Sequence, residues 1–520
     1  SLLRFIAPII ILYRPPLLQS AKVNYSHHKT MTNSPENNYK IKNIRLTLYA
    51  FQLRENADEG YKEIAKNADD LWKNLHSLGK ELNFPDLQDI TKKLKLNQTL
   101  NEWENLLLDN KPNLKLSQTD KNNLKGSFRA EKAQDIYIAE LTLFSQDKLT
   151  PILTNNLPDI FNPQGCLLQP TIKANFGQII LLYAEPVDFN DYRNLADNCV
   201  EVLTKDYIPQ KLVFVNQGEL LDSPIFEYQI PNLETINPSE ICHILVWLKR
   251  NPNTLKQVTK EFDFYLKNLL LYQRKVLSAY YQGRSHYYQG QEKANSLEKK
   301  IPQFTEILQE TDQETRLKKY RQLLKEILSE SFEYRKCLRY LQECENTVNI
   351  NITNFVYSLN NIKTVTLPED KLELWESFLD LAQNKYQKQL EADIKYLIIN
   401  QNLFQEMVGT IRANLEIEQI ESDKDSQKQD ADESRNLNIT IGVVGGGMAV
   451  AGVIASSYTI LKEPPTPLLI PNNGNRLYPF FESIILSVVI GLIPLLVWYF
   501  ILLKTKLFDK RQNNQGNNKP

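Results

Sequence analysis

Two groups of side chains have the residue types that catalysis or ligand binding would use. Cys242 and His243 are adjacent, as a thiol nucleophile and its base, or half of a metal site, would be. Because neighbouring residues of a strand point to opposite faces, we expect a buried structural role for both. The second group interleaves tyrosines with arginines, which suits stacking on nucleotides or single strands. It contains Tyr272, Arg274, Tyr280, Tyr281, Arg284, Tyr287 and Tyr288, and we favour packing between helices because it continues an apolar stripe.

The common catalytic and cofactor motifs are absent from the sequence. It contains no G-x-x-x-x-G-K-[ST], no G-x-G-x-x-G between strand and helix, no H-E-x-x-H and no C-x-x-C. The five cysteines are Cys166, Cys199, Cys242, Cys337 and Cys344, an odd number that indicates buried thiols in a reducing compartment. We therefore expect no enzyme, no cofactor and no metal centre made of protein ligands.

Charge and length limit the class of protein. The 520 residues include 61 Lys and Arg against 62 Asp and Glu. Such a polar, balanced chain is not a polytopic transporter, and it gives no electrostatic reason to expect nucleic acid as a partner. Its length suits several domains.

Two uncharged segments near the C-terminus predict transmembrane helices. The first covers 439–461 and the second 484–503, and each is long enough to span a bilayer. Basic residues are concentrated in the tail at 504–520, whereas the loop at 462–483 holds only Lys462 and Arg476. The positive-inside rule then places the tail and the large N-terminal region in the cytoplasm and the loop outside. This predicts an inner (plasma) membrane protein with both termini inside.

The first predicted span has small residues along one face. Gly442, Gly446, Gly447, Ala451 and Ala455 recur at steps of about four, with Asn438 at the cytoplasmic end. Small residues let helix backbones approach closely. These six residues are therefore candidates either for lining a narrow pore or for packing helices together.

The remaining elements divide the cytoplasmic part in two. The natural start is expected at Met31, with residues 1–30 either an extension of the reading frame or a leader, and 40–250 is expected to be a mixed α/β domain. Strands are predicted at 43–51, 136–144, 178–184, 211–215, 225–230 and 241–248, and helices at 58–82 and 192–203. Residues 251–435 are expected to form a long helical bundle and coiled-coil stalk.

The stalk is predicted from a long apolar seam. Thr366-Leu-Pro-Glu369 has the form of a capping box with Pro in the first turn. From there apolar residues recur from Trp375 through Leu379 and Ala382 to Leu415, over about six heptads. The following 416–435 holds eight acids against three bases. That run is either a solvated linker, which we favour, or an acidic collar at the inner mouth of a pore.

This order of elements resembles the CorA-like family of divalent-cation channels. The resemblance covers about 40–510 and concerns architecture alone. It implies a homopentamer whose first span lines the pore and whose bundle senses the ion. The Gly-Met-Asn motif of that family has no counterpart, since Gly447-Met448 is followed by Ala449, and no family site residue is carried over.

Two functions follow as expectations. The first is a membrane homo-oligomer whose cytoplasmic domain gates a cation pore formed by 439–461, with the lipid bilayer and a cation or small cytoplasmic ligand as partners. The second is a membrane-tethered signalling or defence effector, or a scaffold, whose cytoplasmic domain binds a ligand or partner protein.

Overall fold

The computed structural model describes residues 38–425 except for short gaps. The gaps are 56–63, 97–102, 119–123, 169–170, 189, 206, 209–210 and 231–241, and side chains are described to residue 420. The predicted leader, both predicted spans, the loop, the tail and the six candidates Asn438, Gly442, Gly446, Gly447, Ala451 and Ala455 lie outside the described residues. Among the helices of the described part, none combines the length and the apolar character that crossing a bilayer requires. Residues up to Leu415 form one compact unit and those from Glu416 a second.

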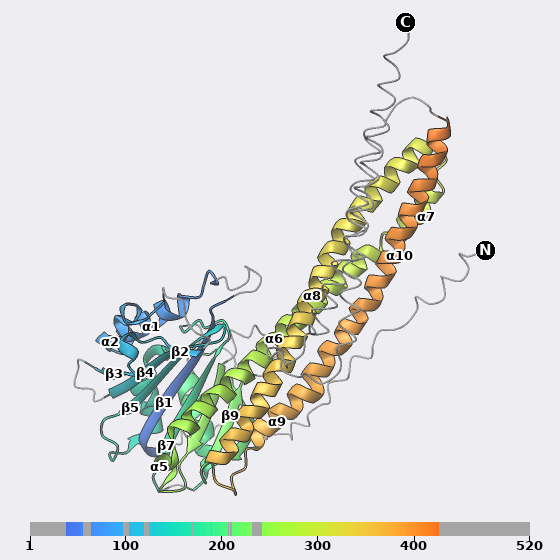
Figure 1. The fold of residues 1–520 in the computed structure, drawn as a ribbon. Coiled ribbons are helices and arrows are strands. Elements are labelled where there is room, and N and C mark those ends of the chain that lie inside the picture. Colours follow the sequence, from blue (N-terminus) through green and yellow to red (C-terminus); the bar gives the residue numbers. More distant parts are fainter. Residues whose placement is uncertain are drawn as a thin grey trace, which may run out of the picture. The chain divides into compact units, whose positions relative to one another are not determined.

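A mixed sheet of ten strands forms the first part of the chain (Figure 1). The spatial order is β2-β4-β5-β1-β7-β10-β9-β8, with β3 paired to β4 and β6 to β1. Only β10 and β7 pair in parallel, and the other pairings are antiparallel. The strands are β1 (Lys40–Leu53), β2 (Trp103–Asn105), β3 (Leu114–Ser117), β4 (Leu124–Ala133), β5 (Ile136–Ser145), β6 (Ile152–Leu153), β7 (Gln178–Pro186), β8 (Val213–Glu219), β9 (Pro224–Gln229) and β10 (Cys242–Leu248).

One face of the sheet carries the main hydrophobic core. Alternate residues of the central strands point to this face, where short helices cover them. Trp72, fully buried, packs on Tyr137 of β5 with ring centroids 5.3 Å apart. The covering elements are α1 (Asp70–Glu81), α2 (Pro85–Gln88), α3 (Leu157–Phe161) and α4 (Tyr192–Thr204), with 3-10 turns at Ile90–Lys93, Leu108–Asn110, Thr154–Asn156 and Pro163–Gly165.

The opposite face of the sheet receives the first half of a long helix. After the short α5 (Thr254–Gln257), α6 (Lys260–Glu298) begins where the Thr259 side chain accepts a hydrogen bond from the Phe262 backbone N–H. Phe262 then stacks on Trp247 of β10, with centroids 6.1 Å apart. The sheet and the helical bundle therefore share one unit, with α6 as the element common to both.

Three long helical stretches make the bundle. Helix α6 turns through α7 (Ile301–Leu308) into α8 (Gln313–Val365), and α8 is followed by α9 (Glu373–Leu381) and α10 (Lys388–Asp425). Between α9 and α10 the chain stays helical as a π segment, Ala382–Gln387. Figure 1 shows α8 and α10 running side by side for much of their length, and Tyr334 of α8 donates to the Leu397 backbone carbonyl of α10 at 2.6 Å.

Most of the predicted elements agree with the structure, and three differ. The strand predictions match β1, β5, β7, β8, β9 and β10 within a few residues. Helix α1 begins at Asp70 rather than near residue 58, and β4 lies where no strand was predicted. The capping box is wrong, because Thr366 ends α8 and the next helix begins only at Glu373. The acidic residue of this loop that makes stabilising contacts is Asp370, not Glu369.

Candidate functional site

The β8–β9 turn has an unusual backbone. Leu220 and Ser223 exchange backbone hydrogen bonds of 2.9 and 3.2 Å around the two central residues. Those residues, Leu221 and Asp222, have φ of 52° and 53°. Two-residue hairpin turns favour Asn and Gly at such positions, since other side chains are strained there. The turn therefore needs stabilisation from outside the hairpin.

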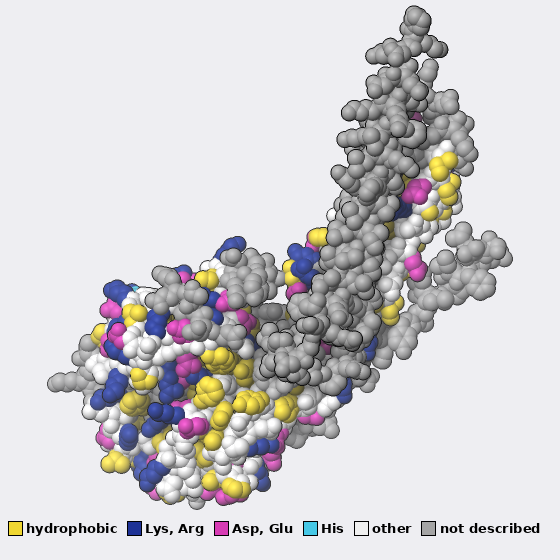
Figure 2. Space-filling model, viewed as in Figure 1, with side chains coloured by type: hydrophobic (Ala, Val, Ile, Leu, Met, Phe, Trp, Pro, Cys, Tyr) yellow, Lys and Arg dark blue, Asp and Glu magenta, His cyan; other side chains and the backbone are white. Residues whose placement is uncertain are grey.

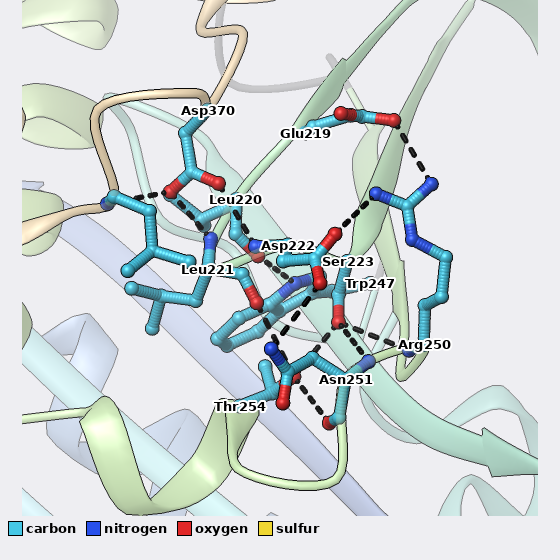
Figure 3. A network of polar contacts seen from close by, with 11 residues as sticks. Glu219, Leu220, Leu221, Asp222, Ser223, Trp247, Arg250, Asn251, Thr254 and Asp370 are labelled. Carbon is cyan, nitrogen blue, oxygen red and sulfur yellow. Dashed lines mark hydrogen bonds and ion pairs between the residues drawn. The ribbon is translucent and has the colours of Figure 1, made fainter.

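Asp370, from the loop between α8 and α9, supplies this stabilisation (Figure 3). Its carboxylate accepts hydrogen bonds from the backbone N–H groups of Leu221 at 2.7 Å and Asp222 at 2.8 Å. It also accepts from Leu367 in its own loop at 3.0 Å. One carboxylate thus satisfies three backbone donors from two segments about 150 residues apart in sequence.

A second set of contacts attaches the same turn to the end of β10. Arg250 donates to Glu219 at 3.0 Å and to Asp222 at 2.6 Å, and these bonds raise the pKa of its guanidinium. Asn251 donates to Asp222 at 3.2 Å. Below them, Trp247 donates from its indole N–H to the Leu220 carbonyl, and the Ser223 hydroxyl accepts from the Arg250 backbone. Figure 3 shows these groups converging on the turn from two sides.

Gly218 allows the loop to lie directly on β8. The Glu219 backbone N–H donates to the Lys371 carbonyl at 2.7 Å. A Cβ at Gly218 would stand 2.5 Å from that carbonyl oxygen, so a side chain there would force the two backbones apart. We call Gly218–Ser223, Arg250, Asn251 and Asp370 the hairpin junction. It fixes the start of α9, two residues after Lys371, to the sheet.

The first part of α10 is held by close helix packing. Gly283 and Gly290, one heptad apart on α6, leave room for Leu390 and Leu397 of α10. Their Cβ positions would approach those leucine side chains to 2.8 and 2.9 Å. Cys344 and Cys337 of α8 line the same positions, as small core residues, which agrees with the role predicted for them.

A buried ion pair connects α6 with α10 at the same level. Arg284 pairs with Asp393, and Asp393 is only 3% exposed. The guanidinium lies 4.9 Å from the Tyr287 ring and 4.8 Å from the Tyr288 ring, and Gln389 donates to the other carboxylate oxygen. Burial raises the pKa of Asp393 above its ordinary value, and Arg284 opposes that rise. This arrangement fixes α10 in one register against α6.

Basic residues of α6 meet acidic or carbonyl groups of the sheet. Lys267 pairs with Glu131, Lys275 pairs with Asp135, and Arg274 donates to the Gln178 carbonyl at 3.0 Å. All three basic residues are at most 5% exposed. They anchor α6 to the sheet.

Cys242 and His243 point to opposite faces, as predicted. Cys242 belongs to the main core, where burial raises its thiol pKa to about 12. His243 faces α6 and lies 2.9 Å from Glu227. The two side chains therefore form neither a nucleophile pair nor a metal site, and among the residues that the structure describes no group of three His, Cys, Asp or Glu side chains is placed to hold a metal.

Lowering the pH should destabilise the folded chain through protonation of His243 in the sheet. Burial lowers the pKa of this residue, against the opposing effect of Glu227, so the unfolded chain takes up the proton first. We expect stability to fall by up to about 1 kcal/mol per pH unit below roughly pH 6.5. The measurement is urea unfolding of the full chain at pH 7 and pH 5. His243→Gln should show a smaller loss than wild type, and equal losses in the two proteins would contradict this.

The tyrosine and arginine group is mostly interior. Tyr272, Tyr280, Tyr281 and Tyr287 are buried, which agrees with the packing role we favoured, and Tyr288 is 57% exposed. No continuous stacking surface is formed by these five residues. On the face seen in Figure 2, Lys and Arg alternate with Asp and Glu over the sheet domain.

Function must be inferred from this geometry. Comparisons of the chain with protein-family models, curated proteins and solved structures found no match. Sequence reasoning missed Asp370, Gly218, Gly283 and Gly290. The two α6 glycines are spaced by one heptad inside a helical seam, which is a usable signal of close helix packing. Asp370 follows a capping-box pattern that concealed its role.

Proposed function

We propose that this protein is an integral membrane homo-oligomer whose cytoplasmic domain gates a cation pore formed by 439–461. One observation supports this most strongly. Helix α9 begins at Glu373, next to the hairpin junction, and the chain stays helical from there through the π segment to Asp425. Asp425 lies 14 residues before the predicted first span. A change in the sheet domain would act on the start of this stretch, and the predicted pore would lie beyond its end.

Exposed apolar residues on the bundle support self-association. Phe332, Ile350 and Tyr357 share one face of α8, since 18 residues make about five turns and seven make about two. They are 62%, 53% and 66% exposed. On α10, Ile399 is 68% exposed and Ile417, 18 residues later, is 56% exposed. Apolar rows of this kind suit contact with a second copy of the chain.

Ion flux into liposomes tests the proposal. The full chain is reconstituted with magnesium- and potassium-sensitive dyes inside the vesicles. We expect flux, and we expect Gly446→Leu to abolish it, because a leucine would fill the small-residue face of the predicted first span. The matched control is Gly409→Leu on α10, where the Cβ position has no neighbour within 4 Å.

The alternative function gives a different result. A folded, oligomeric chain that carries no ions would overturn the channel proposal in favour of a tethered effector or scaffold. Flux that survives Gly446→Leu would instead show that this face does not line the path. Light scattering of each purified protein before reconstitution, against the chain mass of 60.4 kDa, establishes that it is oligomeric.

A further inference from the structure

The buried positions of the stalk change their spacing at one place. Along α10, steps of three and four are mixed between buried residues, and no more than two steps of four follow one another, as an α-helix packed on one side requires. These residues are Leu390, Asp393, Leu397, Gln401, Phe404, Val408, Ile411 and Leu415. Before Leu390 the buried residues are Phe378, Ala382 and Tyr386, so three successive steps are four residues long. That stretch holds one residue more than the repeat of α10 would give it.

The π segment accommodates this additional residue. A π-helical turn contains one extra residue without breaking the helix. Gln383, Asn384 and Lys385 are exposed in this segment, whereas Ala382 and Tyr386 are buried. Tyr386 stacks on Tyr280 of α6 with centroids 4.3 Å apart.

Two fixed points flank the π segment. On one side the hairpin junction holds the start of α9, through Asp370 and the backbone contact at Gly218. On the other side α10 is held by Asp393 and by the bond to its Leu397 carbonyl. The extra residue can therefore change place only between these points, within 373–393.

Helix α9 offers apolar side chains for more than one register. Phe378 is buried, 5.1 Å from Phe355 of α8 in centroid distance, and its neighbour Leu379 is partly buried. If the extra residue moved one turn toward α9, residues 378–383 would rotate by about 100°. Leu379 would then replace Phe378 against α8, and Gln383 would replace Ala382, while Trp375 and Tyr386 would stay inward.

We propose that the π segment is a register joint with these two positions, and that the hairpin junction selects between them. With the junction formed, the extra residue lies at Ala382–Gln387 and Phe378 is inward. Without it, the start of α9 is released from the sheet, α9 rotates and Leu379 turns inward. The inference rests on the proposed function only for its effect on a pore, and it can be tested without one.

Thiol reactivity at two positions tests the joint in the full chain. Phe378→Cys and Leu379→Cys are made separately, and the initial rate of maleimide modification is measured for each. The five native cysteines are buried, and the unsubstituted chain gives their background rate. With the junction intact, the cysteine at 379 should react at least about fivefold faster than the one at 378, because it is the more accessible. Adding Asp370→Ala should reverse this order.

Two further variants separate a register change from loosening. Deleting Asn384 removes the extra residue. The cysteine at 379 should then still react faster than the one at 378, even with Asp370→Ala. Gln383→Leu changes an exposed residue, so this variant should fold normally. With the junction intact it should favour the second register, which slows the cysteine at 379 and speeds the one at 378. Lys385→Leu is its control and should leave both rates unchanged. An equal rise of both rates with Asp370→Ala, or no effect of Gln383→Leu, would overturn the joint whether or not the protein conducts ions.

Discussion

Asp370→Ala should lower the free energy of unfolding by about 3 kcal/mol, because it removes a charged acceptor from three backbone donors. Two of the donors belong to Leu221 and Asp222, whose φ values of 52° and 53° are unfavourable without support. We therefore expect the loss to be concentrated in the β8–β9 turn and the start of α9. Urea unfolding gives the total, and hydrogen exchange of the full chain locates it.

Glu369→Ala is the matched control for this prediction. Its side chain is exposed and directly precedes Asp370 in the same loop. It should change the free energy of unfolding by less than about 0.5 kcal/mol. Faster exchange spread evenly over the sheet, or a loss as small as that of the control, would show that Asp370 does not support the turn.

Arg284→Met should be the most destabilising single substitution in the bundle. It leaves the Asp393 carboxylate, 3% exposed, without its cationic partner. Breaking a buried pair in this way costs about 3 to 5 kcal/mol. The control is Arg339→Met on α8, where the arginine side chain is 63% exposed and its pair with Glu343 contributes little.

The cost of Arg284→Met should depend on pH. Burial already raises the pKa of Asp393 in the folded chain, so stability falls as pH rises from about 3.8 through the folded pKa. Without Arg284 the folded pKa rises further, and the loss extends to higher pH. The difference in free energy of unfolding between variant and wild type should therefore be small near pH 4 and grow toward pH 7. A difference that is constant over this range would mean that lost packing, not the unpaired charge, causes it.

Local sequence patterns predicted the regular elements and not the contacts between them. β1, β5, β7 and β10 are strongly apolar or alternating, so their strands were apparent from sequence. β4 was missed because two of its inward positions, Gly126 and Ala130, are small, which weakens the apolar alternation in Leu124–Ala133, LKGSFRAEKA. Helix α9 was predicted too early because Thr366 to Glu369 fits a capping box that the fold does not use.

The hairpin junction could not be predicted because its parts are distant in sequence. Leu221 carries no sequence signal of a positive φ, and an isolated Asp370 in a loop is unremarkable. Their meeting depends on how α9 lies against β8, which is a tertiary property. The seam was predicted through Leu379, whereas Phe378 is the buried residue. That error has a physical cause, since both positions are apolar and one extra residue lies in the π segment that follows.

We propose that the hairpin junction controls the predicted cation pore through α9 and α10. The most direct measurement is ion flux into liposomes for the wild-type chain, Asp370→Ala and Glu369→Ala, with equal protein in each. We predict that wild type and Glu369→Ala conduct equally and that Asp370→Ala differs from both by at least about fivefold, the lower range of typical coupling between sites. Equal flux from all three folded proteins, or none from any, would contradict the claim.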